Sequence, residues 1–358
     1  MESDVLGPPY ELRRLTFEPD AEGEVVATLV SLRCDKPTTR AVLYLHGFTD
    51  YFFQTHLAEF FTARGYDFYA LDLRKYGRSL LPHQTPNFCW DISEYYAEID
   101  EAVRIIRDED GHDTLLVNGH STGGLIAALW ADRVRGRGLV QGVFLNSPFF
   151  EFNAPWFTRR VVGPLLQRFG RWRPMAKLPQ ELGTTYGLSI HRDHHGEWVY
   201  DLEWKPLAGY PVYAGWVRAI GQAHRRVWAG LAIDVPVLVA CSARSYRGRF
   251  AEAAHHADSV LNVDHIARFA VGLGPDVMLL RIEGGKHDLT LSPPPAREQL
   301  FAELDGWLSR TLGVDYRENR ARGPERPSQP GRRDGASPPA NSPENVSLAD
   351  ASAEPQDG

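Results

Sequence analysis

The amino-acid sequence predicts an α/β fold, in which a mostly parallel sheet is flanked by helices and interrupted by a helical cap insertion. Three observations predict this fold. Apolar strand patterns alternate with helix patterns between residues 41 and 148, the alternation stops over residues 149–234, and it resumes over residues 235–312. Strands separated by helices pair in parallel and place those helices on the faces of the sheet, so one interrupted sheet explains all three observations.

Two further strands precede the alternating region. Residues 12–17 and 25–32 alternate between apolar and polar side chains around a turn at residues 20–23, which predicts an antiparallel pair. Later strands are expected as short apolar runs at residues 41–45, 66–71, 115–117, 141–145, 235–240 and 277–282. Helices are expected at residues 54–64, 92–107, 125–130, 262–269 and 295–312.

The expected domain boundaries follow from this pattern. Residues 1–148 and 235–314 form the two parts of the core, and residues 149–234 form a cap or lid insertion over the carboxyl edge of the sheet. The insertion holds six of the nine tryptophans, so a second structural domain with an aromatic core is the alternative. From about residue 315 the chain is rich in Pro, Gly, Ser and charged residues, which predicts a disordered tail over 315–358.

Composition excludes several classes of protein. The 358 residues carry a net charge of −7, which argues against a nucleic-acid partner because such proteins present a basic face. The three cysteines show neither a disulfide framework nor zinc-ligand spacing, and they fit a reducing compartment. The polar N-terminus lacks the apolar core of a signal peptide, and no apolar run could span a bilayer. We therefore expect a cytoplasmic protein with no integral membrane segment.

The motif Gly119-His-Ser-Thr-Gly123 lies between a predicted buried strand and an Ala-rich helix. Strand, Gly-x-Ser-x-Gly turn and helix together are typical of a nucleophile elbow, which presents its serine above the edge of a sheet. The turn is so tight that a side chain at either glycine would clash. This context predicts that Ser121 is a catalytic nucleophile.

A serine hydroxyl needs a base to take its proton, and the base needs an acid to orient it. Where such an elbow is used, the acid and then the histidine follow the serine along the chain. His287 lies in a glycine-containing loop directly after the last predicted strand, so we expect it to be the base. The acid should follow the preceding strand, where Asp258 is preferred and Asp264 is the alternative.

An oxyanion hole requires two backbone N–H groups. We expect one from Thr122, the residue after the nucleophile, and the other from Phe48, in the loop that follows the strand at residues 41–45. His46, in the same loop, is expected to be a structural hydrogen-bonding residue. The sequence calls for no cofactor and no metal ion in this chemistry.

Five motifs together resemble the monoacylglycerol-lipase and lysophospholipase branch of the α/β-hydrolase superfamily, the serine aminopeptidase S33 group, over about residues 10–312. They are His46-Gly-Phe48, Asp72-x-x-x-x-Gly77-x-Ser79, the elbow, Ala257-Asp-Ser-Val-Leu261 and Gly285-x-His287. The resemblance implies an α/β-hydrolase fold and a serine esterase, whose partner is a small ester with an apolar acyl chain bound under a mobile cap. The cap is larger and richer in tryptophan than is usual in this branch.

Other functions are compatible with the same motifs. An aminopeptidase or amidase would use the same triad, and Glu181, Glu197 and Glu203 in the insertion are candidates for binding a substrate amine. A catalytically silent binding protein would have lost a triad residue or an elbow glycine, and none is lost. The cluster His191-Arg-Asp-His-His195 resembles a set of metal ligands, but its turn-like context favours a surface loop.

Overall fold

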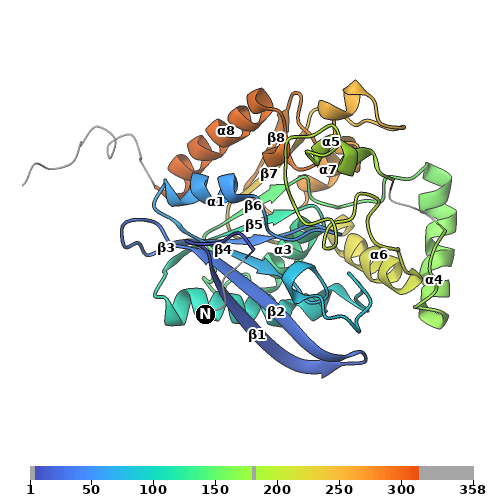
Figure 1. Cartoon of the computed structure of the whole chain (residues 1–358), viewed down its shortest axis with the longest axis horizontal. Helices are drawn as coiled ribbons and strands as arrows, with labels where there is room; N and C mark the ends of the chain where they lie inside the picture. Colours follow the sequence, from blue (N-terminus) through green and yellow to red (C-terminus); the bar gives the residue numbers. More distant parts are fainter. Residues whose placement is uncertain (1–4, 180–182, 314–358) are drawn as a thin grey trace, which may run out of the picture. The chain divides into compact units, whose positions relative to one another are not determined.

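The computed structural model describes residues 5–179 and 183–313, and in this part of the chain eight strands form a single sheet (Figure 1). The strand order is β1-β2-β4-β3-β5-β6-β7-β8. Strands β1 and β2 pair antiparallel, as do β2 and β4, and every other neighbouring pair is parallel. The strands are β1 (Glu11–Asp20), β2 (Gly23–Leu32), β3 (Arg40–Leu45), β4 (Asp67–Asp72), β5 (Thr114–His120), β6 (Gly142–Asn146), β7 (Val237–Ser242) and β8 (Val277–Ile282). The predicted mostly parallel sheet is confirmed.

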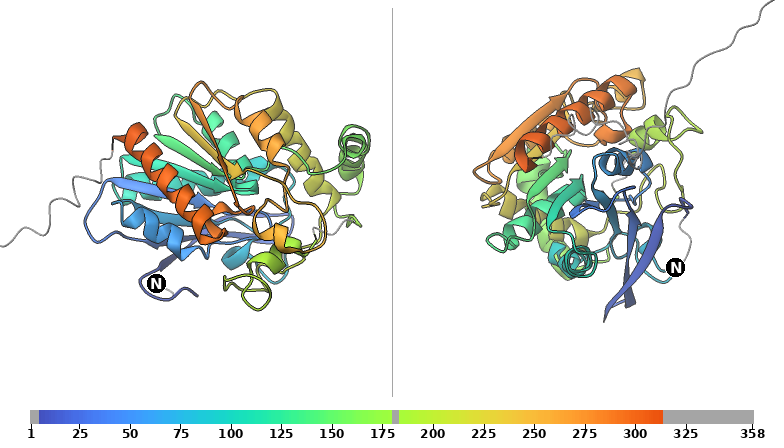
Figure 2. Two further views of the ribbon diagram at one scale, coloured as in Figure 1. Left: turned by 90° about the horizontal axis from the view of Figure 1, so that it is seen from above. Right: turned by 90° about the vertical axis from the view of Figure 1, so that its left-hand side faces the viewer.

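Helices cover both faces of this sheet (Figures 1 and 2). Helices α1 (Thr55–Thr62) and α8 (Pro294–Leu312) bury Phe61 and Leu304 against one face. The other face packs against α2 (Tyr96–Arg104), α3 (Thr122–Arg133), α6 (Ala214–Trp228) and α7 (Val263–Ala270). The parallel strands β3, β4 and β5 each contain a continuous apolar run because both faces are buried in this way.

The interval 149–234 contains three α-helices among its described residues. They are α4 (Gly163–Trp172), preceded by a π-helical turn, η4 (Thr158–Val162), then α5 (Thr185–Ile190) and α6. Helix α6 contributes Ile220 and Val227 to the main core and packs against α3. The interval therefore supplies core packing as well as surface structure.

Helices α4 and α6 approach each other closely (Figure 1). A Cβ on Gly170 would lie 2.2 Å from the Ala214 carbonyl oxygen, and a Cβ on Gly221 would lie 2.1 Å from the Gln167 amide nitrogen. Glycine at these two positions permits the contact, which fixes the side of α4 that is turned inward.

The tail at 315–358 lies outside the described residues. Each helix in residues 5–179 and 183–313 is too short or too polar to cross a lipid bilayer.

Candidate active site

Ser121 is the single residue that links strand β5 to helix α3. Its backbone has φ 52° and ψ −115°, a conformation that non-glycine residues seldom adopt. Ser121 N–H donates to the Asn146 carbonyl at 3.0 Å, and Phe149 N–H donates to the Ser121 carbonyl at 2.9 Å. These bonds from the end of β6 hold the strained turn in place.

The two glycines of the elbow are required by close backbone packing. A Cβ on Gly119 would lie 2.5 Å from the Gly123 carbonyl oxygen. A Cβ on Gly123 would lie 2.3 Å from the carbonyl oxygens of Leu45 and His46, at the end of β3. Backbone atoms cannot retreat as a flexible side chain can, so any larger residue at either position would push the turn out of place.

The structure brings Ser121, His287 and Asp258 together from three separate loops. Ser121 Oγ lies 2.9 Å from His287 Nε2, and His287 Nδ1 lies 2.9 Å from Asp258 Oδ2. Nδ1 donates to the carboxylate, which leaves the lone pair of Nε2 directed at the serine hydroxyl. Asp258 is fully buried and His287 nearly so, while Ser121 keeps 7% of its surface exposed.

Backbone groups hold the Asp258 carboxylate in position. Its Oδ1 accepts hydrogen bonds from the N–H groups of Val260 and Leu261, at 2.8 and 2.7 Å. The alternative acid, Asp264, is exposed and accepts a hydrogen bond from Arg281 at 2.8 Å. The structure thus places Asp258 beside His287 and directs Asp264 to the surface.

Asp288 anchors the loop that carries His287. This buried carboxylate accepts hydrogen bonds from Gln54 Nε2 at 3.1 Å, from Asn146 Nδ2 at 2.7 Å and from Thr290 N–H and Oγ1. Burial raises the pKa of Asp288, but nearby His120 and the bonds from Thr290 and Asn146 outweigh it, so the pKa lies below its ordinary value. This role is not predictable from the sequence, because a single aspartate after a histidine carries no distinctive pattern.

The two residues predicted to form the oxyanion hole belong to segments that adjoin the nucleophile. Thr122 is the first residue of helix α3, where backbone N–H groups have no partner within the helix. A Cβ on Gly47 would lie 3.2 Å from the Ser121 Cβ, so the loop that contains Phe48 adjoins the elbow. His46 Nε2 accepts from Leu73 N–H at 3.0 Å, which leaves Nδ1 to donate to the Gly47 carbonyl at 2.8 Å. These two bonds agree with the structural role expected for His46.

A buried ion pair ties this loop to the insertion. Lys205 Nζ lies 2.6 Å from Asp50 Oδ1, and Asp50 Oδ2 accepts from Gly47 N–H at 3.3 Å. Both side chains are almost wholly inaccessible to solvent. A buried charge is tolerated when it is paired, so the pair holds the loop and the segment around Lys205 together. The two residues are 155 positions apart, so no local pattern in the sequence predicts the pair.

The Asp72-to-Ser79 motif has a structural explanation. The buried Asp72 carboxylate pairs with Arg78 at 2.9 Å and accepts from Phe52 N–H at 2.9 Å. Ser79 Oγ donates to the Asp72 carbonyl at 2.7 Å. A Cβ on Gly77 would lie 2.4 Å from the Tyr51 Cβ, which explains the glycine. The motif closes the loop after β4 and supports the segment that follows Phe48.

Aromatic rings adjoin the loop that contains Phe48. The Phe48 and Trp216 rings lie 4.2 Å apart between centroids, and Phe149 stacks on Trp216 at 6.4 Å. Trp216 is 4% exposed, whereas Trp156 and Trp172 are 65% and 73% exposed. The tryptophans of the insertion therefore occupy quite different environments, and Trp216 is the one in contact with Phe48.

The remaining candidate residues have ordinary surroundings. Glu197 pairs with Arg297, the side chain of Glu203 is exposed, and Glu181 lies outside the described residues. His191 is buried against Tyr200, and His195 stacks on Phe250. Over the ranges 5–179 and 183–313, no group of three or more His, Cys, Asp or Glu side chains is arranged to hold a metal ion.

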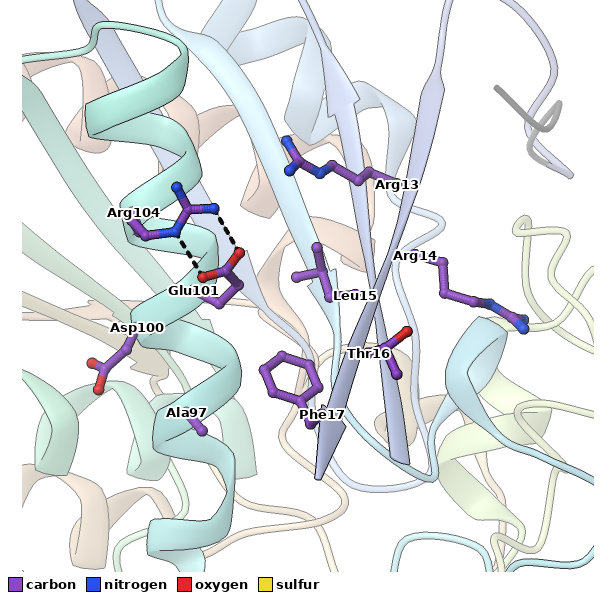
Figure 3. A pocket seen from close by; sticks show the side chains of 9 residues that line it. All are labelled: Arg13, Arg14, Leu15, Thr16, Phe17, Ala97, Asp100, Glu101 and Arg104. Atoms are coloured by element: carbon purple, nitrogen blue, oxygen red, sulfur yellow. Dashed lines mark hydrogen bonds and ion pairs between the residues drawn. The ribbon is translucent and has the colours of Figure 1, made fainter. Parts of the chain in front are cut away.

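Figure 3 shows a groove between strand β1 and helix α2, on the edge of the sheet remote from Ser121. Four of its five charged side chains form ion pairs: Arg104 pairs with Glu101 inside the groove, while Arg13 pairs with Glu109 and Asp100 with Arg133 outside it. The groove contains Thr16 and two carboxylates, but Glu101 pairs with Arg104 and Asp100 pairs with Arg133, so neither carboxylate is placed like His287 beside Ser121.

Comparison with known proteins agrees with this geometry. The model of the family described as serine aminopeptidase, S33, matches residues 36–291, which is more than half of the chain. No curated protein sequence gives a match.

Solved structures show the same fold. A soluble variant of monoglyceride lipase from Saccharomyces cerevisiae, in complex with a substrate analog, gives a TM-score of 0.62 at 15% identity, over 86% of this chain and 97% of that one. The monoacylglycerol lipase of Paleococcus ferrophilus gives 0.59 at 20% identity, over 84% and 99%. A carboxyl esterase from Bacillus coagulans, in complex with glycerol, gives 0.61 at 14% identity, over 84% and 99%. The expected α/β-hydrolase fold is confirmed.

Replacement of glycine by alanine should have opposite effects on stability in the elbow and in helix α8. Gly119→Ala should lower the free energy of unfolding by about 3 kcal/mol, because its Cβ meets backbone atoms. Gly306→Ala, inside helix α8, meets only the flexible end of Arg310 and should raise stability by about 0.5–1 kcal/mol. Urea unfolding measures both, and a Gly119→Ala variant as stable as the wild type would contradict the described turn.

Proposed function

Because the chain belongs to the serine aminopeptidase S33 family of α/β hydrolases, we propose that it is a serine hydrolase that cleaves carboxylic esters. The single observation that carries this proposal is the hydrogen-bonded series Asp258–His287–Ser121, which ends on a serine with positive φ. Hydrogen bonding from nucleophile to base to acid is the arrangement that activates a serine hydroxyl.

In the first half of the reaction, Ser121 Oγ attacks the ester carbonyl carbon while His287 Nε2 takes the hydroxyl proton. Asp258 holds the imidazole in the required tautomer and stabilises the imidazolium that forms. The N–H groups of Phe48 and Thr122 donate to the developing oxyanion. When the intermediate collapses, His287 returns the proton to the departing alkoxide, and an acyl group remains on Ser121.

In the second half, a water molecule replaces the alcohol. His287 takes a proton from the water as its oxygen attacks the acyl carbon, and the same two N–H groups receive the second oxyanion. Collapse breaks the bond to Ser121 Oγ, which recovers its proton from His287. The products are one carboxylic acid and one alcohol, and the triad uses neither a metal ion nor a cofactor.

The substrate we propose is a small ester with an apolar acyl chain, as in monoacylglycerols and lysophospholipids. Phe48, Phe149 and Trp216 support this proposal, because they place apolar ring surface beside the predicted oxyanion hole. The interval 149–234 would act as the cap of this site. The structure of the yeast monoglyceride lipase, which has the same fold, contains a substrate analog of that enzyme.

The aminopeptidase alternative rests on the description of the family, and it requires a carboxylate free to bind a substrate amine. Glu197 is already paired with Arg297, which weighs against its use. A silent binding protein would have no need of a strained serine in contact with a base.

The unpaired state of Cys34, Cys89 and Cys241 supports our proposal of a cytoplasmic location.

Replacement of each candidate acid by asparagine tests the assignment of the triad acid. Asp258→Asn should lower kcat for p-nitrophenyl butyrate by about 10⁴-fold, because the amide no longer holds His287 in the reactive tautomer. Asp264→Asn, an identical change at an exposed position, should leave kcat within about twofold. Steady-state kinetics on variants of verified fold measure both, and a collapse confined to Asp264→Asn would reverse the assignment.

A panel of p-nitrophenyl esters beside aminoacyl-anilides tests the substrate class. We expect ester hydrolysis to depend on acyl length and to exceed anilide hydrolysis. Trp216→Ala should change the preferred length, because it removes ring surface beside Phe48, and it should keep activity on the acetyl ester. Trp90→Ala, at a half-exposed tryptophan outside the insertion, is the control. Equal rates from acetyl to long acyl esters in every variant would contradict an apolar acyl site.

A further inference from the structure

Helix α4 and the turn before it expose a continuous apolar stripe. Phe157, Val161, Leu165 and Phe169 recur every four residues, so they lie along one side of the helix. Leu165 is 63% exposed and Phe169 is 46% exposed. With the largely exposed Trp156 and Trp172, these residues define what we call the α4 face. Large apolar side chains gathered on one surface mark an interaction site.

The α4 face is separate from the side of the helix that packs on the protein. Gly170 and Gln167 contact helix α6, and Arg225 of α6 donates a hydrogen bond to Gln167. Core packing therefore uses one side of α4 and leaves the stripe on the other. The helix stands beside α6 at the margin of the molecule (Figure 1).

The surroundings of the α4 face are basic although the chain as a whole is acidic. Residues 152–179 contain five arginines and one lysine and no Asp or Glu, whereas the complete chain has a net charge of −7. Arg159 pairs with Glu151, and the other five cations are exposed. These five are Arg160, Arg168, Arg171, Arg173 and Lys177. Helix α6, beside α4, adds three arginines and also lacks acidic residues.

We propose that the α4 face docks on the surface of an anionic lipid bilayer, with its apolar stripe among the acyl chains and its arginines at the lipid phosphates. A surface helix that exposes aromatic and aliphatic residues flanked by arginines has the composition of interfacial membrane helices. A second copy of the chain is a poorer occupant, because face-to-face contact would bring five cations against five cations. Docking of this kind needs no helix that spans the bilayer.

Vesicle co-sedimentation of the full-length protein tests this proposal. The two probes are vesicles of phosphatidylcholine alone and vesicles in which about one third of the lipid is phosphatidylglycerol. The wild type should bind the phosphatidylglycerol vesicles at least about tenfold more tightly, and added salt should weaken that binding. Equal binding to both vesicles, or no binding to either, would overturn the proposal.

Two double variants separate the apolar and ionic contributions. Leu165→Gln/Phe169→Gln should weaken binding to phosphatidylglycerol vesicles by at least about tenfold. Arg168→Gln/Arg171→Gln should weaken it about 30-fold, at about fivefold for each cation lost near an anionic surface. The matched control, Arg14→Gln/Arg310→Gln, removes two exposed arginines on β1 and α8 and should bind like the wild type. Unchanged binding by either α4 variant would contradict docking through this face.

Two further measurements keep the result unambiguous. Ser121→Ala should bind vesicles as the wild type does, so failure of the proposed hydrolase chemistry leaves this inference standing. Light scattering determines the oligomeric state in the absence of lipid. A wild-type dimer that Leu165→Gln/Phe169→Gln converts to a monomer would show that a second copy covers the α4 face, and the lipid proposal would fall.

Discussion

The position of Ser121 depends on how closely the β5–α3 turn approaches the end of strand β3. Gly123 lies against the Leu45 and His46 carbonyls, and Gly119 lies against the Gly123 carbonyl, at distances that any Cβ would prevent. This contact places Ser121 at the start of helix α3 and sets the loop containing Phe48 beside it. Nucleophile and predicted oxyanion donors are thus arranged by backbone packing, and no flexible side chain is needed to align them.

Buried polar groups hold the other loops against this turn. Asp288 joins the His287 loop to Gln54 and Asn146, and Asn146 also receives the Ser121 N–H at its carbonyl. The Asp50–Lys205 pair joins the loop that contains Phe48 to the interval 149–234. Removal of one partner from such a pair leaves an uncompensated buried charge, so these contacts favour a single arrangement of the loops. The proposed site is therefore built from parts that are distant in sequence and mutually dependent in space.

Sequence alone was sufficient to locate the strands, because the parallel strands contain short apolar runs, the first two strands alternate around a turn, and the elbow has a strict local pattern. The strand expected at 235–240 begins two residues later, after Pro236, which lacks an N–H for the ladder. Local pattern left Asp258 and Asp264 as alternatives, since both follow the same strand, and only tertiary contacts separate them. Lys205 gave no signal, because nothing near it in the sequence indicates a partner 155 positions earlier.

Covalent labelling by a fluorophosphonate tests the central claim, that Ser121 is an activated nucleophile. The reagent reacts with serines whose hydroxyl is deprotonated by a neighbouring base, which His287 would supply. We predict that the wild-type chain is labelled, that peptide mapping places the adduct on Ser121, and that Ser121→Ala is not labelled. Labelling that persists in Ser121→Ala, or that maps to another residue, would contradict the account.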